Sequence, residues 1–238
     1  MKLYVIPTER VCNAHCNFCI TNSREFSGRE FLSVGDLESA LKKFELDSIE
    51  VTGGGEPILN PIIREILEMC IEKTPTQIYT NGVHAKKILD LDLSYLCISR
   101  SHQDSEINRE IMGINYDERQ IFDSGQRVKL SLVASNSGVH DYSGLMDYFD
   151  WAKQNKVIKV VVRQMFDETL PEVFEREFVS TEKLARDFDC KEKDGNLFTD
   201  YHGMNIEFEL RSCACEFNNP VLHADGIIYK GWSSEELR

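Results

Sequence analysis

The sequence lacks the features that would place it in a membrane or on nucleic acid. None of its apolar runs approaches the roughly 20 residues that a membrane-spanning helix needs, and its first residues do not form a signal-peptide pattern. Basic side chains are in deficit, 27 against 40 acidic ones. This argues against sequence-independent nucleic-acid binding, which relies on a basic surface. Solenoid repeats and low-complexity segments are also absent. We therefore expect a cytoplasmic protein that binds neither membrane nor nucleic acid.

The composition is that of an ordinary globular protein. Apolar residues make up 42% and charged residues 28% of 238 positions, enough for one sizeable α/β domain. Eight cysteines are present. In a reducing compartment, cysteines serve as ligands or core thiols more often than as disulfides.

Six apolar strand-like runs alternate with helical patterns, which predicts a parallel sheet with right-handed crossovers. Periodicity alone does not separate a doubly wound sheet from a partial barrel. In both, functional residues gather at the carboxyl ends of the strands. The predicted strands are Leu3–Ile6, Ser48–Thr52, Gln77–Thr80, Tyr95–Ser99, Val128–Ala134 and Val157–Val162.

The pattern changes from Asp167 onward. A charged helix is predicted over Thr181–Phe188 and an alternating strand over Asn205–Leu210. Asp225-Gly226 then supplies the turn of a hairpin. We expect a core over residues 1–166 and a C-terminal α+β extension over 167–238, which packs on the core and is a candidate for covering the substrate.

Three cysteines directly after the first strand carry the strongest chemical signal. Cys12, Cys16 and Cys19 have the spacing C-x₃-C-x₂-C. Three thiolates with inorganic sulfide can hold an iron–sulfur cluster, whose usual complement is four cysteines, so one iron is left without a protein ligand. Zinc normally takes four ligands, and His15 would have to fold back within the same short loop to be the fourth. The spacing favours a cluster with an open iron.

The glycine-rich run after the second strand, Gly53-Gly54-Gly55-Glu56-Pro57, is less specific. It lacks the G-x-G-x-x-G spacing of a dinucleotide site and the Gly-Lys-Ser/Thr of a P-loop. Alone, it is typical of a tight turn.

Together, the cysteine motif with Phe18 before its third cysteine and the Gly54-Gly55-Glu56 run resemble the radical S-adenosylmethionine (radical SAM) enzymes, and most of all their molybdenum-cofactor-type branch. The resemblance implies a partial (β/α)₆ barrel and a [4Fe-4S] cluster on Cys12, Cys16 and Cys19. It also implies that SAM binds the open iron and is cleaved reductively to a 5′-deoxyadenosyl radical that abstracts hydrogen. The electron would come from a donor such as flavodoxin or ferredoxin.

The resemblance also implies roles for individual residues around SAM. The Gly54, Gly55 and Glu56 run would receive the ammonium of its methionine part, and Phe18 and Met165 would lie beside the adenine. Ser99 and Arg163 are further candidates for contact with SAM, and Thr80 faces the substrate side. Each of these residues also has an ordinary structural reading, as core or turn.

The chain departs from the family pattern at Arg100, where many relatives carry an acidic residue. Arg100, His102 and Arg163 are predicted near the mouth of the barrel. Because arginine binds carboxylates and phosphates well, we expect an anionic substrate or a contact with the SAM carboxylate. The alternative is a salt bridge with one of the many acidic residues.

Cys190, Cys213 and Cys215 form a second set, which invites an auxiliary iron–sulfur cluster completed by His202 or His223. The extension offers only three thiols, so this second cluster is the weaker alternative.

These observations predict an enzyme that abstracts a hydrogen atom from a small polar molecule. One alternative is an activase for a glycyl-radical partner, although the N-terminal segment usual in activases is missing. A second is a peptide-modifying enzyme, although no leader-binding domain precedes the first strand. The third, from another class, is a non-catalytic iron–sulfur or zinc protein.

Overall fold

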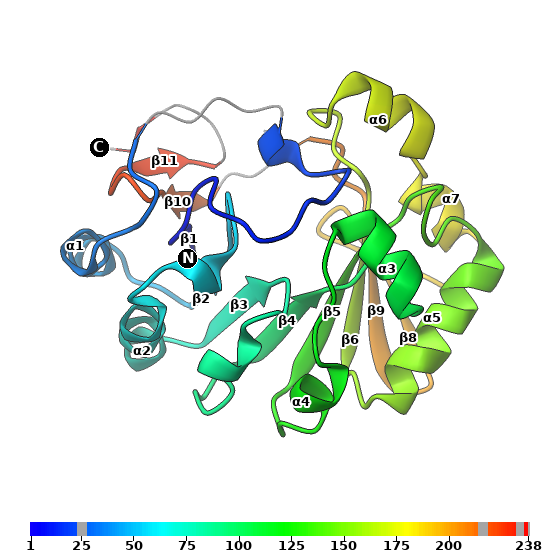
Figure 1. The fold of residues 1–238 in the computed structure, drawn as a ribbon, viewed down its shortest axis with the longest axis horizontal. Helices are drawn as coiled ribbons and strands as arrows, with labels where there is room; N and C mark the ends of the chain where they lie inside the picture. The colour runs from blue at the N-terminus through cyan, green and yellow to red at the C-terminus, as the bar shows by residue number, and fades with distance from the viewer. Residues whose placement is uncertain (23–27, 214–218, 232–235, 238) are drawn as a thin grey trace.

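The computed structural model describes residues 1–22, 28–213, 219–231 and 236–237, and its framework is one sheet of eleven strands. The six predicted strands are present, and neighbours among them pair in parallel. Figure 1 shows the sheet as a curved, unclosed wall with helices on its outer side, the partial barrel that was predicted. The strands are β1 (Lys2–Val5), β2 (Ser48–Val51), β3 (Thr76–Thr80), β4 (Tyr95–Ser99), β5 (Val128–Val133) and β6 (Lys159–Arg163).

Helices connect these strands and cover the outer face. Helix α1 shows why they form where they do: Ser33 accepts a hydrogen bond from the backbone N–H of Asp36, and Leu37, Ala40 and Leu41 are buried on one face. The helices are α1 (Val34–Lys43), α2 (Ile63–Lys73), α3 (Ser105–Met112), α4 (Glu118–Phe122), α5 (Tyr142–Gln154), α6 (Pro171–Glu177) and α7 (Thr181–Ala185), with 3₁₀ turns η1 (Ile20–Asn22), η2 (Pro57–Leu59) and η3 (Ala85–Lys87).

The C-terminal extension continues both edges of the sheet. Strand β9 (Met204–Glu209) pairs in parallel with β6, followed outward by β8 (Asn196–Tyr201) and β7 (Lys191–Lys193). At the other edge, β10 (Pro220–Leu222) pairs in parallel with β1 and forms the predicted hairpin with β11 (Ile228–Lys230). Figure 1 shows β10 and β11 at one end of the wall and β8 and β9 at the other. The boundary at residue 166 is therefore not a break in the sheet.

The described residues include no helix with both the length and the apolar character needed to cross a membrane.

Arg100 is part of the fold rather than of the barrel interior. Its side chain is 0% exposed and forms an ion pair with Glu118. Its guanidinium lies 5.2 Å from the ring centroids of both Tyr116 and Trp151, and its Nε donates to the carbonyl of His102 at 2.7 Å. Successive side chains of a strand point to opposite faces, so Arg100 lies outside while Ser99 lies inside.

The expectation that Arg100 binds an anionic ligand therefore disagrees with the structure, which favours the alternative salt bridge. His102 is in the same position outside the interior: its Nδ1 accepts from the backbone N–H of Asp104 at 3.0 Å, where the chain turns into α3. Burial lowers the pKa of His102.

We predict that Arg100→Ala lowers the free energy of unfolding by about 3 kcal/mol. The change removes the ion pair with Glu118, which leaves that carboxylate without its buried partner, and it removes the contacts of the guanidinium with the Tyr116 and Trp151 rings. SAM affinity of the folded variant should be unchanged. Urea denaturation and equilibrium SAM binding measure the two quantities.

The matched control is Arg127→Ala. Arg127 is exposed and lies over one ring, that of Tyr95, at 4.7 Å, so its loss should cost less than about 1 kcal/mol. If Arg100→Ala had wild-type stability but no longer bound SAM, the prediction would be wrong and Arg100 would be a ligand-binding residue.

Candidate active site

The three predicted cysteines line one cavity at the carboxyl ends of the strands. Cys12, Cys16 and Cys19 share this cavity of about 300 Å³ with Arg10, Gly53 and Gly55. All three thiols are free. The structure therefore brings the cysteines together as the sequence predicted, and it places the glycine-rich run beside them.

Backbone hydrogen bonds join the cysteine loop to the glycine-rich run. The N–H of Arg10 donates to the carbonyl of Gly54 at 3.0 Å, and the N–H of Glu56 donates to the carbonyl of Val11 at 2.9 Å. A Cβ on Gly55 would lie 2.5 Å from the Val11 carbonyl oxygen. Glycine is needed at position 55 because the two backbones approach too closely for any side chain.

A helix end holds the other side of the cysteine loop. The N–H of His15 donates to the carbonyl of Met112 at 2.9 Å, and that of Asn17 to the carbonyl of Ile111 at 3.2 Å. These are carbonyls of the last turn of α3, which have no partner within the helix. Gly113, with φ 73°, ends that helix in the left-handed conformation that favours glycine. The loop is thus fixed by main-chain contacts on both sides.

The thiol geometry fits a cluster better than a single zinc ion. Among the described residues, Cys12, Cys16 and Cys19 do not form a group whose ligand atoms all lie within 4.8 Å of one another. Sulfurs around tetrahedral zinc would lie about 3.8 Å apart, given Zn–S bonds of about 2.3 Å. In an iron–sulfur cluster the cysteines bind different irons and can be farther apart. Burial raises the pKa of Cys12, and it raises that of Cys16 to about 12, so a bound cation is needed to hold these thiols ionised.

Glu56 is buried, 3% exposed, at the junction of β2 and β3. Its Oε1 accepts from the Thr80 hydroxyl at 2.5 Å and its Oε2 from the backbone N–H of Asn81 at 2.8 Å. Burial raises the pKa of Glu56, and these two hydrogen bonds oppose the rise. Thr80 therefore positions Glu56, and the Asn81 side chain in turn donates to Asn13 of the cysteine loop at 2.7 Å.

A second cavity of about 190 Å³ extends from the cysteines over the strand ends. It is lined by Phe18, Glu56, Thr80 and Ser99, which were all predicted from the sequence to surround SAM or substrate. Met165, in contrast, is 2% exposed and is not among the residues that line these cavities.

A third cavity of about 460 Å³ fills the interior of the partial barrel, and we call it the lumen cavity. Its lining side chains are strongly polar. They include five basic residues and three acidic residues. It adjoins the second cavity, since both are lined by Thr52, Gly53, Tyr79, Ser99 and Ser131.

Arg163 lies in the lumen cavity, within a network that crosses the barrel. Its guanidinium pairs with Glu209 at 2.5 Å and donates from Nε to the Ser131 hydroxyl at 2.8 Å. The remaining acidic residues are also paired, Glu50 with Lys2 and Glu207 with Lys159. Arg163 therefore lies next to the predicted SAM site, where Glu209 and Ser131 hold its guanidinium.

The sequence analysis missed most of this lumen: Tyr79, Lys129, Ser131, Lys159, Glu207 and Glu209. A signal was available, because polar residues occupy every second position of otherwise apolar strands. Lys129 and Ser131 in β5 are an example, alternating with the buried Leu130.

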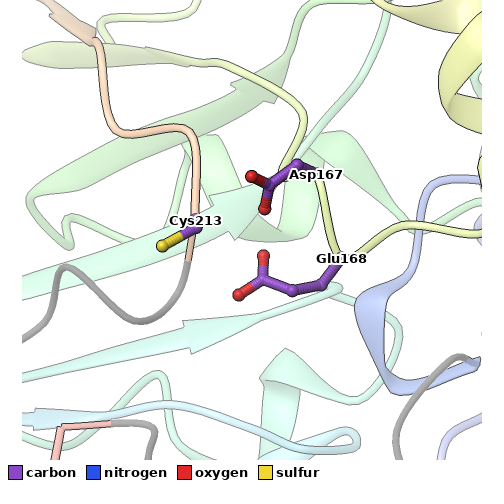
Figure 2. Close-up of side chains that lie close together, drawn as sticks. All are labelled: Asp167, Glu168 and Cys213. Atoms are coloured by element: carbon purple, nitrogen blue, oxygen red, sulfur yellow. The ribbon is translucent and has the colours of Figure 1, made fainter.

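The second cysteine set does not assemble in the described part of the chain. Cys215 lies outside the described residues. The Cys190 thiol contacts the Ala185 carbonyl at 3.7 Å. Figure 2 shows that the side chains beside Cys213 are carboxylates, those of Asp167 and Glu168. Cys213 is itself disulfide-bonded, contrary to the expectation of ligands or core thiols, so it offers no thiolate to a cluster.

The two proposed completing residues have other partners. His223 pairs with Glu9 at 2.5 Å, and the ring of His202 packs against the ring of Tyr201, with 4.7 Å between the centroids. The described residues therefore give the auxiliary cluster no support.

We predict that Gly55→Ala displaces the cysteine loop, because its Cβ would overlap the Val11 carbonyl. The expected cost is about 1–3 kcal/mol of unfolding free energy, together with less bound iron after anaerobic reconstitution. Thermal unfolding and iron analysis provide the two measurements.

Gly35→Ala is the matched control. Nothing lies within 4 Å of a Cβ built at Gly35 in α1, so this change should keep the iron content and stabilise the protein by up to about 1 kcal/mol. Equal iron content in both variants would show that the close approach at Gly55 does not hold the loop.

Comparison with known proteins agrees with this arrangement. The family model of the radical SAM superfamily matches residues 6–131. A curated relative, GTP 3′,8-cyclase of Aquifex aeolicus, is 25% identical over 142 residues, which cover 54% of this chain and 44% of that protein. The chain thus spans less than half the length of this relative.

Solved structures share the fold. SuiB of Streptococcus suis bound to S-adenosylmethionine superposes with a TM-score of 0.61 at 20% identity, covering 76% of this chain and 44% of that one. The native enzyme anSMEcpe with bound AdoMet gives a TM-score of 0.58 at 15% identity, covering 96% and 73%. The family match spans more than half of the chain and includes the cysteine loop and the glycine-rich run, so this protein belongs to the radical SAM superfamily of enzymes.

Proposed function

We propose that this protein cleaves SAM reductively and abstracts a hydrogen atom from a small polar substrate held in the lumen cavity. The observation that carries the proposal is the junction of two cavities: the one lined by the three thiols and Glu56 shares five residues with the charged interior of the barrel. A group bound at the cysteines is therefore adjacent to space for a second molecule, of a size that suits a small ligand.

Cys12, Cys16 and Cys19 would hold a [4Fe-4S] cluster, and their family uses such a cluster with SAM. When bound, the cluster supplies the electron that splits SAM into methionine and a 5′-deoxyadenosyl radical. The chain's own residues position and enclose the reactants. Gly55 allows the close backbone approach, the run of Gly54, Gly55 and Glu56 would receive the ammonium of SAM, and Phe18 and Ser99 line the space beside it. The wall of the partial barrel would limit the access of water and oxygen to the radical.

Peptide modification is the second candidate. Two structural neighbours were solved with peptides: SuiB with its precursor peptide SuiA, and anSMEcpe with the peptide Cp18Cys. A peptide substrate would place one side chain in the lumen cavity and leave its backbone outside. A screen of small molecules against short peptides separates the two candidates by which class accelerates SAM cleavage.

The decisive measurement is release of 5′-deoxyadenosine from anaerobically reconstituted, reduced protein supplied with SAM. We expect release from the wild type and at least a hundredfold less from Cys16→Ala, because three thiolates are needed to hold the cluster while one iron stays open.

Cys70→Ala is the matched control. Cys70 is a free thiol buried in α2 within the apolar core, and this variant should release 5′-deoxyadenosine at the wild-type level. Absence of release from wild-type protein with an intact cluster, at all substrates tried, would contradict the proposal.

A further inference from the structure

The lumen cavity carries a surplus of positive charge in an acidic protein. Its lining has five basic and three acidic side chains, whereas the chain as a whole has a net charge of −13. Each of the three carboxylates is already paired with a basic side chain. The described side chains of the lumen therefore do not balance its charge.

Arg211 shares Glu209 with Arg163, so Lys129 is the basic side chain that these pairs leave over. Its side chain is 6% exposed, and within the described ranges no carboxylate forms an ion pair with it. Its hydrogen bond goes to the Tyr79 hydroxyl oxygen at 2.6 Å. An ammonium has three donors, so two stay available toward the cavity. Burying a cation without a counter-ion is costly, and burial accordingly lowers the pKa of Lys129.

Tyr79 supplies a second donor at the same place. Its oxygen accepts from Lys129 and also from Nη2 of Arg163 at 3.4 Å. Its own O–H has no acceptor among the residues described by the structure. Burial raises the pKa of Tyr79 well above its usual value, so the phenol keeps its proton. An anion in the lumen cavity would accept from both the ammonium and the phenol.

We propose that Lys129 and Tyr79 bind an anionic group of the substrate, a carboxylate or a phosphate ester, inside the barrel. This rests on the proposed function and names the substrate class of that site. The register of β4 and β5 indicates how the substrate is oriented in the cavity. Lys129 pairs across the sheet with Cys97, and Ser131 pairs with Ser99, so the anionic group lies about 6.6 Å below the serines. The serines line both cavities, so the remainder of the substrate extends toward the cysteine loop.

The test measures binding of two probe ions, sulfate and acetate, to the reconstituted protein with saturating SAM. Sulfate represents a phosphate ester and acetate a carboxylate, and both keep a constant charge between pH 6 and pH 11. Apparent Kd values come from the shift of the unfolding midpoint at constant ionic strength. Preference for sulfate or for acetate identifies the source of the anionic group, and either one supports the site.

Lys129→Met should weaken binding of the preferred probe at least about tenfold, because it removes a charge-assisted hydrogen bond. Tyr79→Phe should weaken it several-fold. Lys43→Met, an exposed lysine on α1, is the matched control and should bind as the wild type does. Undiminished binding by Lys129→Met would overturn the proposal, as would absence of binding to wild type or its abolition by SAM.

A pH profile keeps the test valid should Lys129→Met fail to fold. Wild-type binding should weaken as the pH rises through the lowered pKa of Lys129, since the neutral amine loses its attraction for an anion. Lys129→Arg stays charged, so its binding should be constant over the same range. Wild-type binding that did not change with pH up to 11 would overturn the proposal.

The other groups facing Lys129 do not produce such a profile. Glu50 on β2 is paired with Lys2, and Lys159 and Arg163 on β6 are paired with Glu207 and Glu209. Burial raises the pKa of Cys97 on β4 to about 12. Probe binding needs no turnover, so an anion site without 5′-deoxyadenosine release would separate this proposal from the proposed function.

Discussion

The close backbone approach between the cysteine loop and the glycine-rich run is the constraint on which the site depends. Two main-chain hydrogen bonds join the segments, and the Gly55 Cα lies where a side chain would overlap the Val11 carbonyl. The loop itself has little apolar surface to bury, so main-chain contacts rather than packing must fix its shape. The carbonyls at the end of α3 and the side chain of Asn81 provide further contacts. The main-chain hydrogen bonds that hold the thiols therefore persist under most substitutions, except those at the glycines and those to proline.

The interior of the barrel is polar because strand alternation separates two environments. In β4 and the residue after it, Ser99 faces the lumen cavity while Arg100 is buried among helices outside. The outer face is largely apolar and supplies the free energy of folding. The inner face holds charged pairs whose desolvation is costly and which add little stability. The charged pairs give the lumen cavity a defined distribution of charge. They contribute to the recognition of a ligand more than to the stability of the fold.

Much of the fold could be predicted from the sequence, because long parallel strands and capped helices have strong local signals. The six strands and the hairpin at Asp225-Gly226 are all present. The cysteine loop and the glycine-rich run were found because short motifs carry their chemistry in their spacing. Arg100 was misplaced because it follows Ser99 directly. Neighbouring side chains of a strand point to opposite faces, so Arg100 points to the outer face of the sheet while Ser99 points into the barrel. Lys129 was missed although strand alternation marked it, because its importance depends on which carboxylates of the other strands are already paired.

The pairing of β1 with β10 has a consequence for how the chain is made. Tyr4 and Val221 are register partners, although more than two hundred residues separate them in sequence. During synthesis, the strand that leads into the cysteine loop can pair with β2 early, yet its other edge stays open until residues 220–222 leave the ribosome. Exposed edges of this kind favour pairing with other chains, and contacts of such long range form slowly. Until β10 is made, the outer edge of β1 is therefore exposed and able to pair with other chains.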